Sequence, residues 1–128
     1  MTYLIDTCAF LWLAGGDPRL SVPARDCLVS GANRVAFSAA SSWELAIKYR
    51  LGRLDLPDVP SRFIPEALRA LSLEPLQVTH SHAVRVGDLP DHHRDPFDRL
   101  LAAQSLIEGH TIVSPDEIFD AYGVSRFW

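Results

Sequence analysis

Short apolar segments alternate along the chain with longer segments in which apolar residues recur at helical spacing. The stretches TYLI at 2–5 and RVAFS at 34–38 have the length and composition of buried strands. Glycines at 31, 52 and 109 stand where helical patterns end. The pattern predicts strands over 2–5, 34–38, 76–78 and 111–113, an edge strand over 124–127, and helices over about 10–14, 22–29, 42–51, 61–71, 81–86, 96–108 and 115–122.

Three of the predicted helices begin with a recognisable capping signal. Asp95 fits an N-cap, and Pro96 fits the first helical position, where a backbone N–H is not needed. Residues 41–44 match a capping box, in which Ser is the N-cap and Glu lies three residues further on. Residues 114–117 match a second capping box with proline at the first helical position. These signals predict where the helices after the second and fourth strands begin.

The alternation of strands with helices predicts an α/β fold with a mostly parallel central sheet. Because the strands are short and apolar, we expect helices on both faces of that sheet. We expect one domain over residues 1–128, since no internal repeat or long linker divides the chain.

Composition narrows the class of protein. A hydrophobic content of 48 % is typical of a folded domain, and the net charge of −4 argues against a general nucleic-acid coat protein, which would be basic. The N-terminal apolar stretch has no preceding Lys or Arg and is interrupted by Asp6, which argues against a signal peptide or a membrane span. With only two cysteines, we expect a cytoplasmic protein without disulfides.

Four acidic residues are predicted to lie near one edge of the sheet. Asp6 follows the first strand, Glu44 lies one turn into the helix after the second, and Asp116 follows the fourth. Asp98 begins the helix that leads to the fourth strand. Since the carboxyl ends of parallel strands share one edge, the acids can meet in a crevice there. Structural alternatives remain open, because a capping box would by itself account for Glu44, and a favourable charge at a helix N-terminus would by itself account for Asp116.

Carboxylates that share a crevice repel one another. At about 4 Å and an effective dielectric constant of ~20, each pair costs on the order of 4 kcal/mol before screening. Asp6 also lacks a nearby cationic partner, because no Lys or Arg occurs between residues 1 and 17. A divalent ion would relieve the repulsion, and oxygen ligands favour Mg²⁺ or Mn²⁺. Such a site suits phosphodiester hydrolysis.

Four motifs that span most of the chain resemble one known family. The motifs are LIDTCAFLW, SSWELAIKYRLGRL, HRDPFDRLLAAQ and IVSPDEIFDAYGV, and their order and spacing are similar to those of the PIN-domain ribonucleases, in particular VapC-type toxins of type II toxin–antitoxin systems. The resemblance implies a three-layer α/β/α fold and Mg²⁺- or Mn²⁺-dependent cleavage of RNA. It also implies a homodimer that a VapB-type antitoxin inhibits.

The resemblance also implies roles for individual residues. Asp6, Glu44, Asp98 and Asp116 match the catalytic, metal-binding acids of the family. Thr7, Arg99 and Ser114 are candidates for groups that support the acids or contact phosphate, with Thr7 expected to hydrogen-bond Asp6. The sequence departs from the family pattern at Cys8, where His, Asn or Ser is usual, and at Ser114, where Thr is usual.

Two further basic residues lie close to the acids. Lys48 follows Glu44 by one helical turn, so either an ion pair with Glu44 or a contact with an RNA phosphate is expected. His93 precedes the acidic helix start and is a candidate substrate contact.

The apolar residues Phe10, Leu11 and Leu13 are candidates for a groove that receives the antitoxin.

A second function is compatible with the same acids. A non-catalytic module with an acidic pocket could act only through a protein partner. A receiver-type phosphoacceptor domain fits poorly, since Asp6 has no adjacent acid and no lysine follows Lys48. Metal titration with an RNA-cleavage assay distinguishes the nuclease from the binding module.

Overall fold

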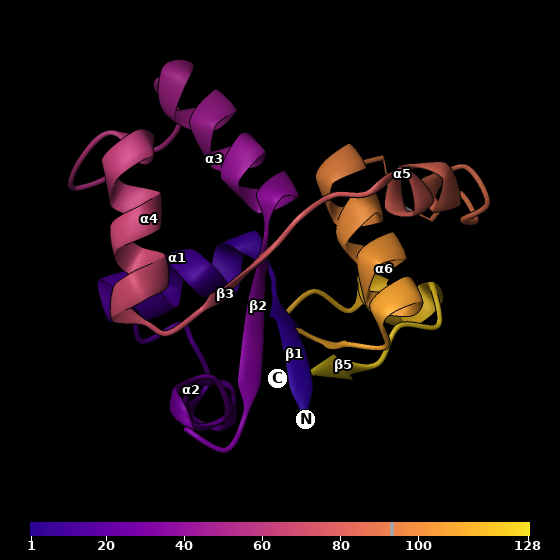
Figure 1. Cartoon of the computed structure of the whole chain (residues 1–128), viewed down its shortest axis with the longest axis horizontal. Coiled ribbons are helices and arrows are strands. Elements are labelled where there is room, and N and C mark those ends of the chain that lie inside the picture. The colour runs from indigo at the N-terminus through magenta and orange to yellow at the C-terminus, as the bar shows by residue number, and fades with distance from the viewer. Residues whose placement is uncertain (93) are drawn as a thin grey trace.

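The computed structural model describes residues 1–92 and 94–128 and shows a five-stranded sheet in which every neighbouring pair of strands is parallel. The strand order is β3-β2-β1-β4-β5 (Figure 1). The strands are β1 (Thr2–Ile5), β2 (Arg34–Ser38), β3 (Glu74–Leu76), β4 (Thr111–Val113) and β5 (Arg126–Phe127). The helices are α1 (Thr7–Gly15), α2 (Val22–Val29), α3 (Ala39–Arg50), α4 (Pro60–Ala70), α5 (His80–Val86), α6 (Pro96–Glu108) and α7 (Ile118–Ala121).

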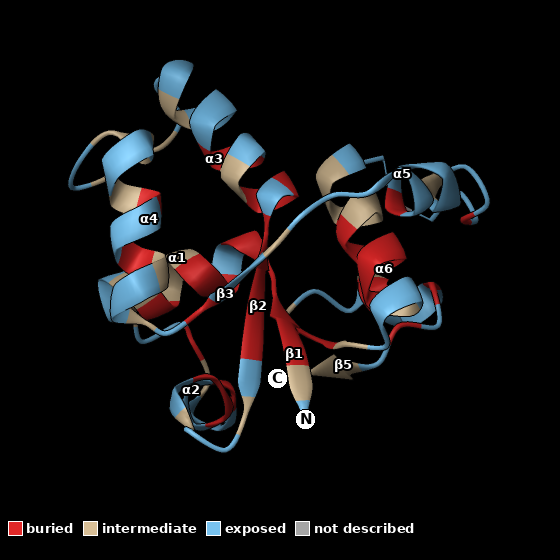
Figure 2. Ribbon diagram, in the orientation of Figure 1, coloured by how far each residue is buried: buried red, intermediate tan, exposed pale blue. Residues whose placement is uncertain are grey.

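Successive residues of the central strands point to opposite faces of the sheet, and each face has its own apolar core. Tyr3 and Ile5 pack on the side of α1, α2 and α4. Leu4 and Ile112 pack on the other side with residues of α6 and α7, such as Leu101. Buried residues accordingly concentrate on the central strands and on the helix sides that face them (Figure 2). This three-layer arrangement confirms the predicted α/β/α fold.

The strands agree closely with the sequence pattern. The predicted strands at 2–5, 34–38 and 111–113 are confirmed, and β5 is an edge strand as predicted. The third strand lies at Glu74–Leu76 rather than 76–78 and also forms a sheet edge. Within residues 1–92 and 94–128, no helix combines the length and the apolar composition that crossing a bilayer requires.

The two helix starts that were predicted from capping boxes are wrong, and both corrections concern residues next to the candidate site. The capping box over 41–44 does not form: α3 begins at Ala39, with Ser38 as its N-cap, so β2 runs directly into the helix. The capping box over 114–117 does not form either, because α7 begins only at Ile118. In both places, the serine expected to cap a helix makes a tertiary hydrogen bond, with Thr7 for Ser41 and with Asp6 for Ser114, although Ser114 Oγ also accepts from the Asp116 N–H.

The first helix also differs from the prediction. A short turn was expected over 10–14, but α1 spans Thr7–Gly15 and is capped by the Asp6 side chain, which accepts a hydrogen bond from the Ala9 N–H. The helix α6 agrees with its prediction. Asp95 caps it, Pro96 occupies its first position, and Gly109 ends it in the left-handed conformation (φ 71°), which glycine adopts without steric cost.

Candidate active site

A pocket of about 440 Å³ lies at the carboxyl ends of β1 and β4, between the first turns of α1 and α6 and one face of α3. All four acids expected at this edge line it. The described residues that line it are Asp6, Thr7, Cys8, Leu11, Glu44, Leu45, Lys48, Asp95, Asp98, Pro115 and Asp116. The structure therefore brings together carboxylates from four separate parts of the chain.

Asp6 is the most constrained acid of the pocket. It directly follows β1, its residue is only 5 % exposed, and its backbone N–H donates to the Val113 carbonyl at 3.1 Å. Its Oδ1 accepts from the Ala9 N–H at 2.7 Å, and its Oδ2 accepts from the Ser114 hydroxyl at 2.5 Å. Both carboxylate oxygens are thereby held in a fixed orientation.

Burial raises the pKa of Asp6 to about 6, because removal from water disfavours the charged form. The hydrogen bonds from Ser114 and Ala9 act in the opposite direction and lower this pKa. The negative charges of Asp116 and Glu44 raise it further. The pocket therefore resists additional negative charge, which is the electrostatic condition under which a cation binds well.

Glu44 projects from α3 and is also 5 % exposed. Its Oε1 accepts from the Thr7 hydroxyl at 2.7 Å, and the Thr7 oxygen lies 2.9 Å from Ser41 Oγ. Its Oε2 lies 2.5 Å from Lys48 Nζ, one turn further along the same helix. The ion pair that was one of two expectations for Lys48 is thus formed, and it lies in the pocket.

Asp116 and Asp98 complete the set at the mouth of the pocket. Asp116 is exposed; its N–H donates to Ser114 Oγ at 3.0 Å, and its Oδ1 accepts from the Ile118 N–H at 3.0 Å. Asp98 is half-buried in the first turn of α6, where backbone amides favour negative charge. Asp95 accepts from the Phe97 N–H at 2.9 Å, which confirms its role as N-cap.

The donor set fits a hard divalent cation, because the pocket offers carboxylate and hydroxyl oxygens. In the described part of the chain, however, no three His, Cys, Asp or Glu side chains are close enough to share one ion. Protein partners hold the two buried acids: Ser114 on Asp6, and Thr7 and Lys48 on Glu44. Binding of an ion would therefore require small side-chain movements within the pocket.

Several supporting residues lie elsewhere than expected. Thr7 donates to Glu44 rather than to Asp6, because it lies in the first turn of α1 opposite α3. Ser114 does contact Asp6. His93 lies outside the described residues. Of the three apolar residues expected in an antitoxin groove, Phe10 and Leu13 are buried in the core, and Leu11 lines the acidic pocket.

Arg99 does not face the pocket. Its guanidinium donates to the backbone carbonyls of Pro90 at 2.8 Å, Val86 at 3.0 Å and Leu89 at 3.3 Å, and it lies over the ring of Tyr122. Arg99 directly follows Asp98 on α6, and one helical residue turns the side chain by about 100°. The arginine therefore anchors the segment that follows α5 instead of contacting the acids.

Two pocket residues have properties that sequence reasoning did not find. Cys8 is an exposed residue that lines the pocket, but its thiol is partly removed from water. This desolvation, and then the charge of Asp6, raises the pKa of the thiol to about 11. It is therefore a neutral thiol near pH 7. Asp95 lines the pocket in addition to capping α6, and adds a fifth carboxylate. Its position three residues before Asp98 in HRDPFD was the available signal.

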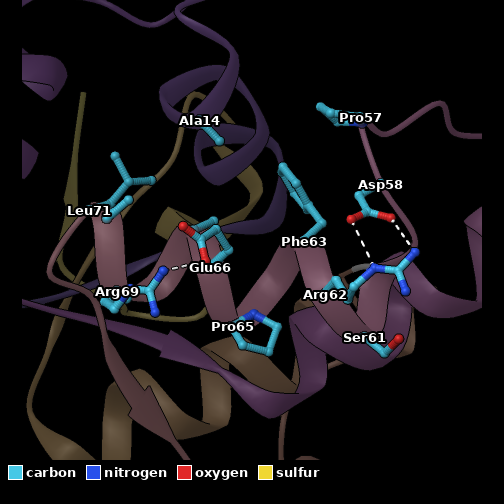
Figure 3. Close-up of a pocket in the computed structure, with 12 residues that line it drawn as sticks. Ala14, Pro57, Asp58, Ser61, Arg62, Phe63, Pro65, Glu66, Arg69 and Leu71 are labelled. Carbon is cyan, nitrogen blue, oxygen red and sulfur yellow. Dashed lines mark hydrogen bonds and ion pairs between the residues drawn. The ribbon is translucent and has the colours of Figure 1, made fainter.

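A second cavity, of about 720 Å³, runs along α4 beside the end of α1 (Figure 3). Apolar side chains such as Phe63 and Leu71 line it together with Ala14. Two ion pairs flank it, Asp58 with Arg62 and Glu66 with Arg69. This cavity, called the α4 groove below, is separate from the acidic pocket, and none of the described residues lines both.

Comparisons with known proteins give one family profile and one curated relative. The sequence profile described as PIN domain matches residues 3–124. Ribonuclease VapC16 of Mycobacterium tuberculosis is 39 % identical over 69 residues, which cover 51 % of this chain and 49 % of that protein. The chain thus spans about half the length of the curated relative it matches.

Solved structures with the same fold include several VapBC structures. VapBC2 of Rickettsia felis, bound to a promoter DNA fragment, superposes with a TM-score of 0.71 at 18 % identity, covering 100 % of this chain and 99 % of that one. DNA-bound VapBC of Salmonella typhimurium gives a TM-score of 0.71 at 18 % identity, with 99 % and 97 % coverage. VapBC-1 of nontypeable Haemophilus influenzae gives 0.65 at 14 % identity, with 99 % and 97 % coverage. At these identities the likeness shows the fold.

Proposed function

This chain belongs to the PIN-domain family, and from that premise we propose that it is a Mg²⁺- or Mn²⁺-dependent endoribonuclease that acts as the toxin of a VapBC-type toxin–antitoxin pair. The observation that carries the proposal is the convergence of Asp6, Glu44, Asp98 and Asp116 on one pocket. The similarity to Ribonuclease VapC16 supports RNA as the substrate, and the VapBC complexes support an antitoxin as the partner.

Asp6, Glu44, Asp98 and Asp116 would hold the divalent cation, and a cation bound there would activate water and stabilise negative charge on a phosphate. The chain's own groups prepare the pocket for this task. Ser114 orients Asp6 and Thr7 orients Glu44, so neither buried carboxylate is free to rotate. The raised pKa of Asp6 means that it must lose its proton near neutral pH before the pocket reaches full negative charge.

The partners in this proposal are an RNA substrate, a second copy of the chain and a VapB-type antitoxin. We place the antitoxin segment in the α4 groove, because apolar side chains such as Phe63 and Leu71 line this groove and two ion pairs flank it. The acidic pocket is a poor alternative for an apolar segment, since five of its eleven described lining residues carry a carboxylate. The groove also leaves the pocket open, so the toxin site and the antitoxin contact can be tested separately.

An RNA-cleavage assay with the purified chain tests the proposed function. We expect cleavage of single-stranded RNA with Mn²⁺ or Mg²⁺, and none with EDTA. Asp6→Asn and Asp98→Asn are expected to reduce the rate by at least about 100-fold while the proteins remain folded. Asp26→Asn is the matched control, because Asp26 is exposed on α2, away from the pocket. Full activity of either pocket variant would overturn the proposal. An inactive chain that still binds a protein partner would favour the non-catalytic module.

A further inference from the structure

Among the described residues that line the acidic pocket, Lys48 is the one basic side chain. Its Nζ lies 2.5 Å from Glu44 Oε2, and the charges of Asp95 and Asp98 act on it as well. The two partners differ in exposure: the Glu44 side chain is 6 % exposed, whereas that of Lys48 is 48 % exposed. The carboxylate is therefore fixed in the protein, and the ammonium reaches it from the solvent side.

Both carboxylate oxygens of Glu44 are already engaged by protein groups, so an incoming ion would compete with them. Thr7 donates to Oε1 at 2.7 Å, and Lys48 occupies Oε2. The Thr7 hydroxyl is neutral and buried, and it can remain bound while the other oxygen changes its partner. Lys48 is a cation on a flexible chain, so it is the partner that a second cation would repel.

We propose that Lys48 is a tethered counter-ion of the pocket, which neutralises Glu44 until a divalent cation displaces it and which thereby weakens the affinity of the pocket for that cation. This inference rests on the proposed function, because it assumes that the four acids bind the ion. It explains why the acids line one pocket while no three of the described His, Cys, Asp or Glu side chains are close enough to share an ion. The Lys48 ammonium supplies part of the positive charge that the ion would otherwise supply.

Two physical consequences follow from this exchange. Removing the ammonium should tighten binding of a divalent cation, because the ion no longer competes for Glu44 and no positive charge remains beside it. The same change should weaken the metal-free fold, because a buried carboxylate loses its partner. A lysine that only stabilised α3 would produce the second effect without the first.

The test is calorimetric titration of the purified, metal-free chain with Mn²⁺ at pH 7.5. Lys48→Met keeps the length and apolar stem of the side chain, and we expect it to bind Mn²⁺ about tenfold more tightly. Lys48→Arg keeps the charge and should remain within about twofold of the unaltered chain. Arg50→Met is the matched control, because it removes a positive charge from the same helix outside the pocket, and its affinity should not change.

Thermal unfolding gives a second measurement. Without metal, Lys48→Met should melt at a lower temperature than the unaltered chain. Saturating Mn²⁺ should raise its Tm by more than it raises that of the unaltered chain, since a ligand at free concentration L stabilises the folded state by RT ln(1 + L/Kd), which grows as Kd falls. Equal Mn²⁺-induced shifts in the two proteins would overturn the inference.

The outcomes also separate this inference from the function on which it rests. If the unaltered chain shows no saturable Mn²⁺ binding, or if Asp6→Asn binds Mn²⁺ equally well, the metal site and hence the proposed function are wrong. If Asp6→Asn abolishes binding but Lys48→Met binds with unchanged or weaker affinity, the metal site stands and the counter-ion role of Lys48 is wrong.

Discussion

The Ser114 hydroxyl donates a 2.5 Å hydrogen bond to Asp6 Oδ2 and thereby joins the ends of β4 and β1 beside the acidic pocket. Ser114 Oγ also accepts from the Asp116 N–H at 3.0 Å. One fully buried hydroxyl thus orients one acid directly and holds the backbone of another. The residues are far apart in the sequence, and only the pairing of their strands brings them together.

Ser114→Ala should lower the stability of the fold and remove a hydrogen bond that orients the Asp6 carboxylate. The buried Asp6 carboxylate would lose its hydroxyl donor, which is expected to lower the free energy of unfolding by about 1–3 kcal/mol and to raise the pKa of Asp6 further. Urea unfolding at pH 8 with EDTA measures the loss. Ser125→Ala is the control, since Ser125 is exposed. A variant as stable as the unaltered chain would show that the hydrogen bond contributes nothing.

Stability should depend on pH through Asp6, in a direction that can be worked out. Its pKa is raised from 3.8 to about 6 in the folded chain, so the folded state binds the proton more tightly than the unfolded state. Stability is therefore favoured at low pH and is lost as pH rises from about 4 to about 6, by up to about 3 kcal/mol from this group.

Comparison with Asp6→Asn isolates this contribution from those of other titrating groups. Without metal, the difference in free energy of unfolding between the variant and the unaltered chain should grow in favour of the variant between pH 4 and 7. Urea unfolding at several pH values measures it. A difference that is constant over this range would mean that Asp6 titrates at its ordinary pKa.

Arg99→Met should destabilise the segment that follows α5. The variant removes the donors to the carbonyls of Val86, Leu89 and Pro90, and we expect a loss of about 2 kcal/mol together with faster amide exchange over residues 86–91. Arg85→Met, at an exposed position on α5, is the control. If Arg99→Met instead weakened RNA binding at unchanged stability, the arginine would be a substrate contact, as the sequence had suggested.

His82→Leu should lower the free energy of unfolding by more than His80→Leu does. His82 is fully buried; its Nδ1 accepts from the Thr79 N–H at 3.0 Å, and its Nε2 lies 2.7 Å from Glu108 Oε1, which links α5 to α6. Leucine fills similar space but removes the hydrogen bonds to both partners, so we expect a loss of about 1–3 kcal/mol in urea unfolding. His80→Leu, at an exposed position, should change little. Similar losses in both variants would contradict the link.

Ala70→Glu should separate antitoxin binding from catalysis. Ala70 is exposed in the α4 groove, and a charged side chain there would disturb an apolar segment lying in it. Against a VapB-type antitoxin, we expect binding at least about tenfold weaker by calorimetry, with RNA cleavage by the free chain unchanged. Ala83→Glu on α5 is the control. Unchanged affinity of the Ala70 variant would place the antitoxin elsewhere.

Much of the fold was predictable from local patterns. Strands β1, β2 and β4 are apolar over most of their length because both faces of a parallel sheet are buried, and this burial appears directly in the sequence. The start of α6 was predictable because an N-cap and a proline act within one turn. The order of the strands then places Asp6, Glu44 and Asp116 at one edge.

The sequence by itself therefore determined the α/β class, the main strands and the candidate acids, since burial and helix capping act over a few neighbouring residues. Only the tertiary structure decided which partner each polar group takes. Ser41 and Ser114 were predicted to be helix caps, but in the fold Ser41 hydrogen-bonds Thr7 and Ser114 hydrogen-bonds Asp6. Arg99 turned away from the acids because backbone carbonyls near α5 surround its guanidinium. Such choices depend on groups that meet only after folding, and a local pattern does not contain them.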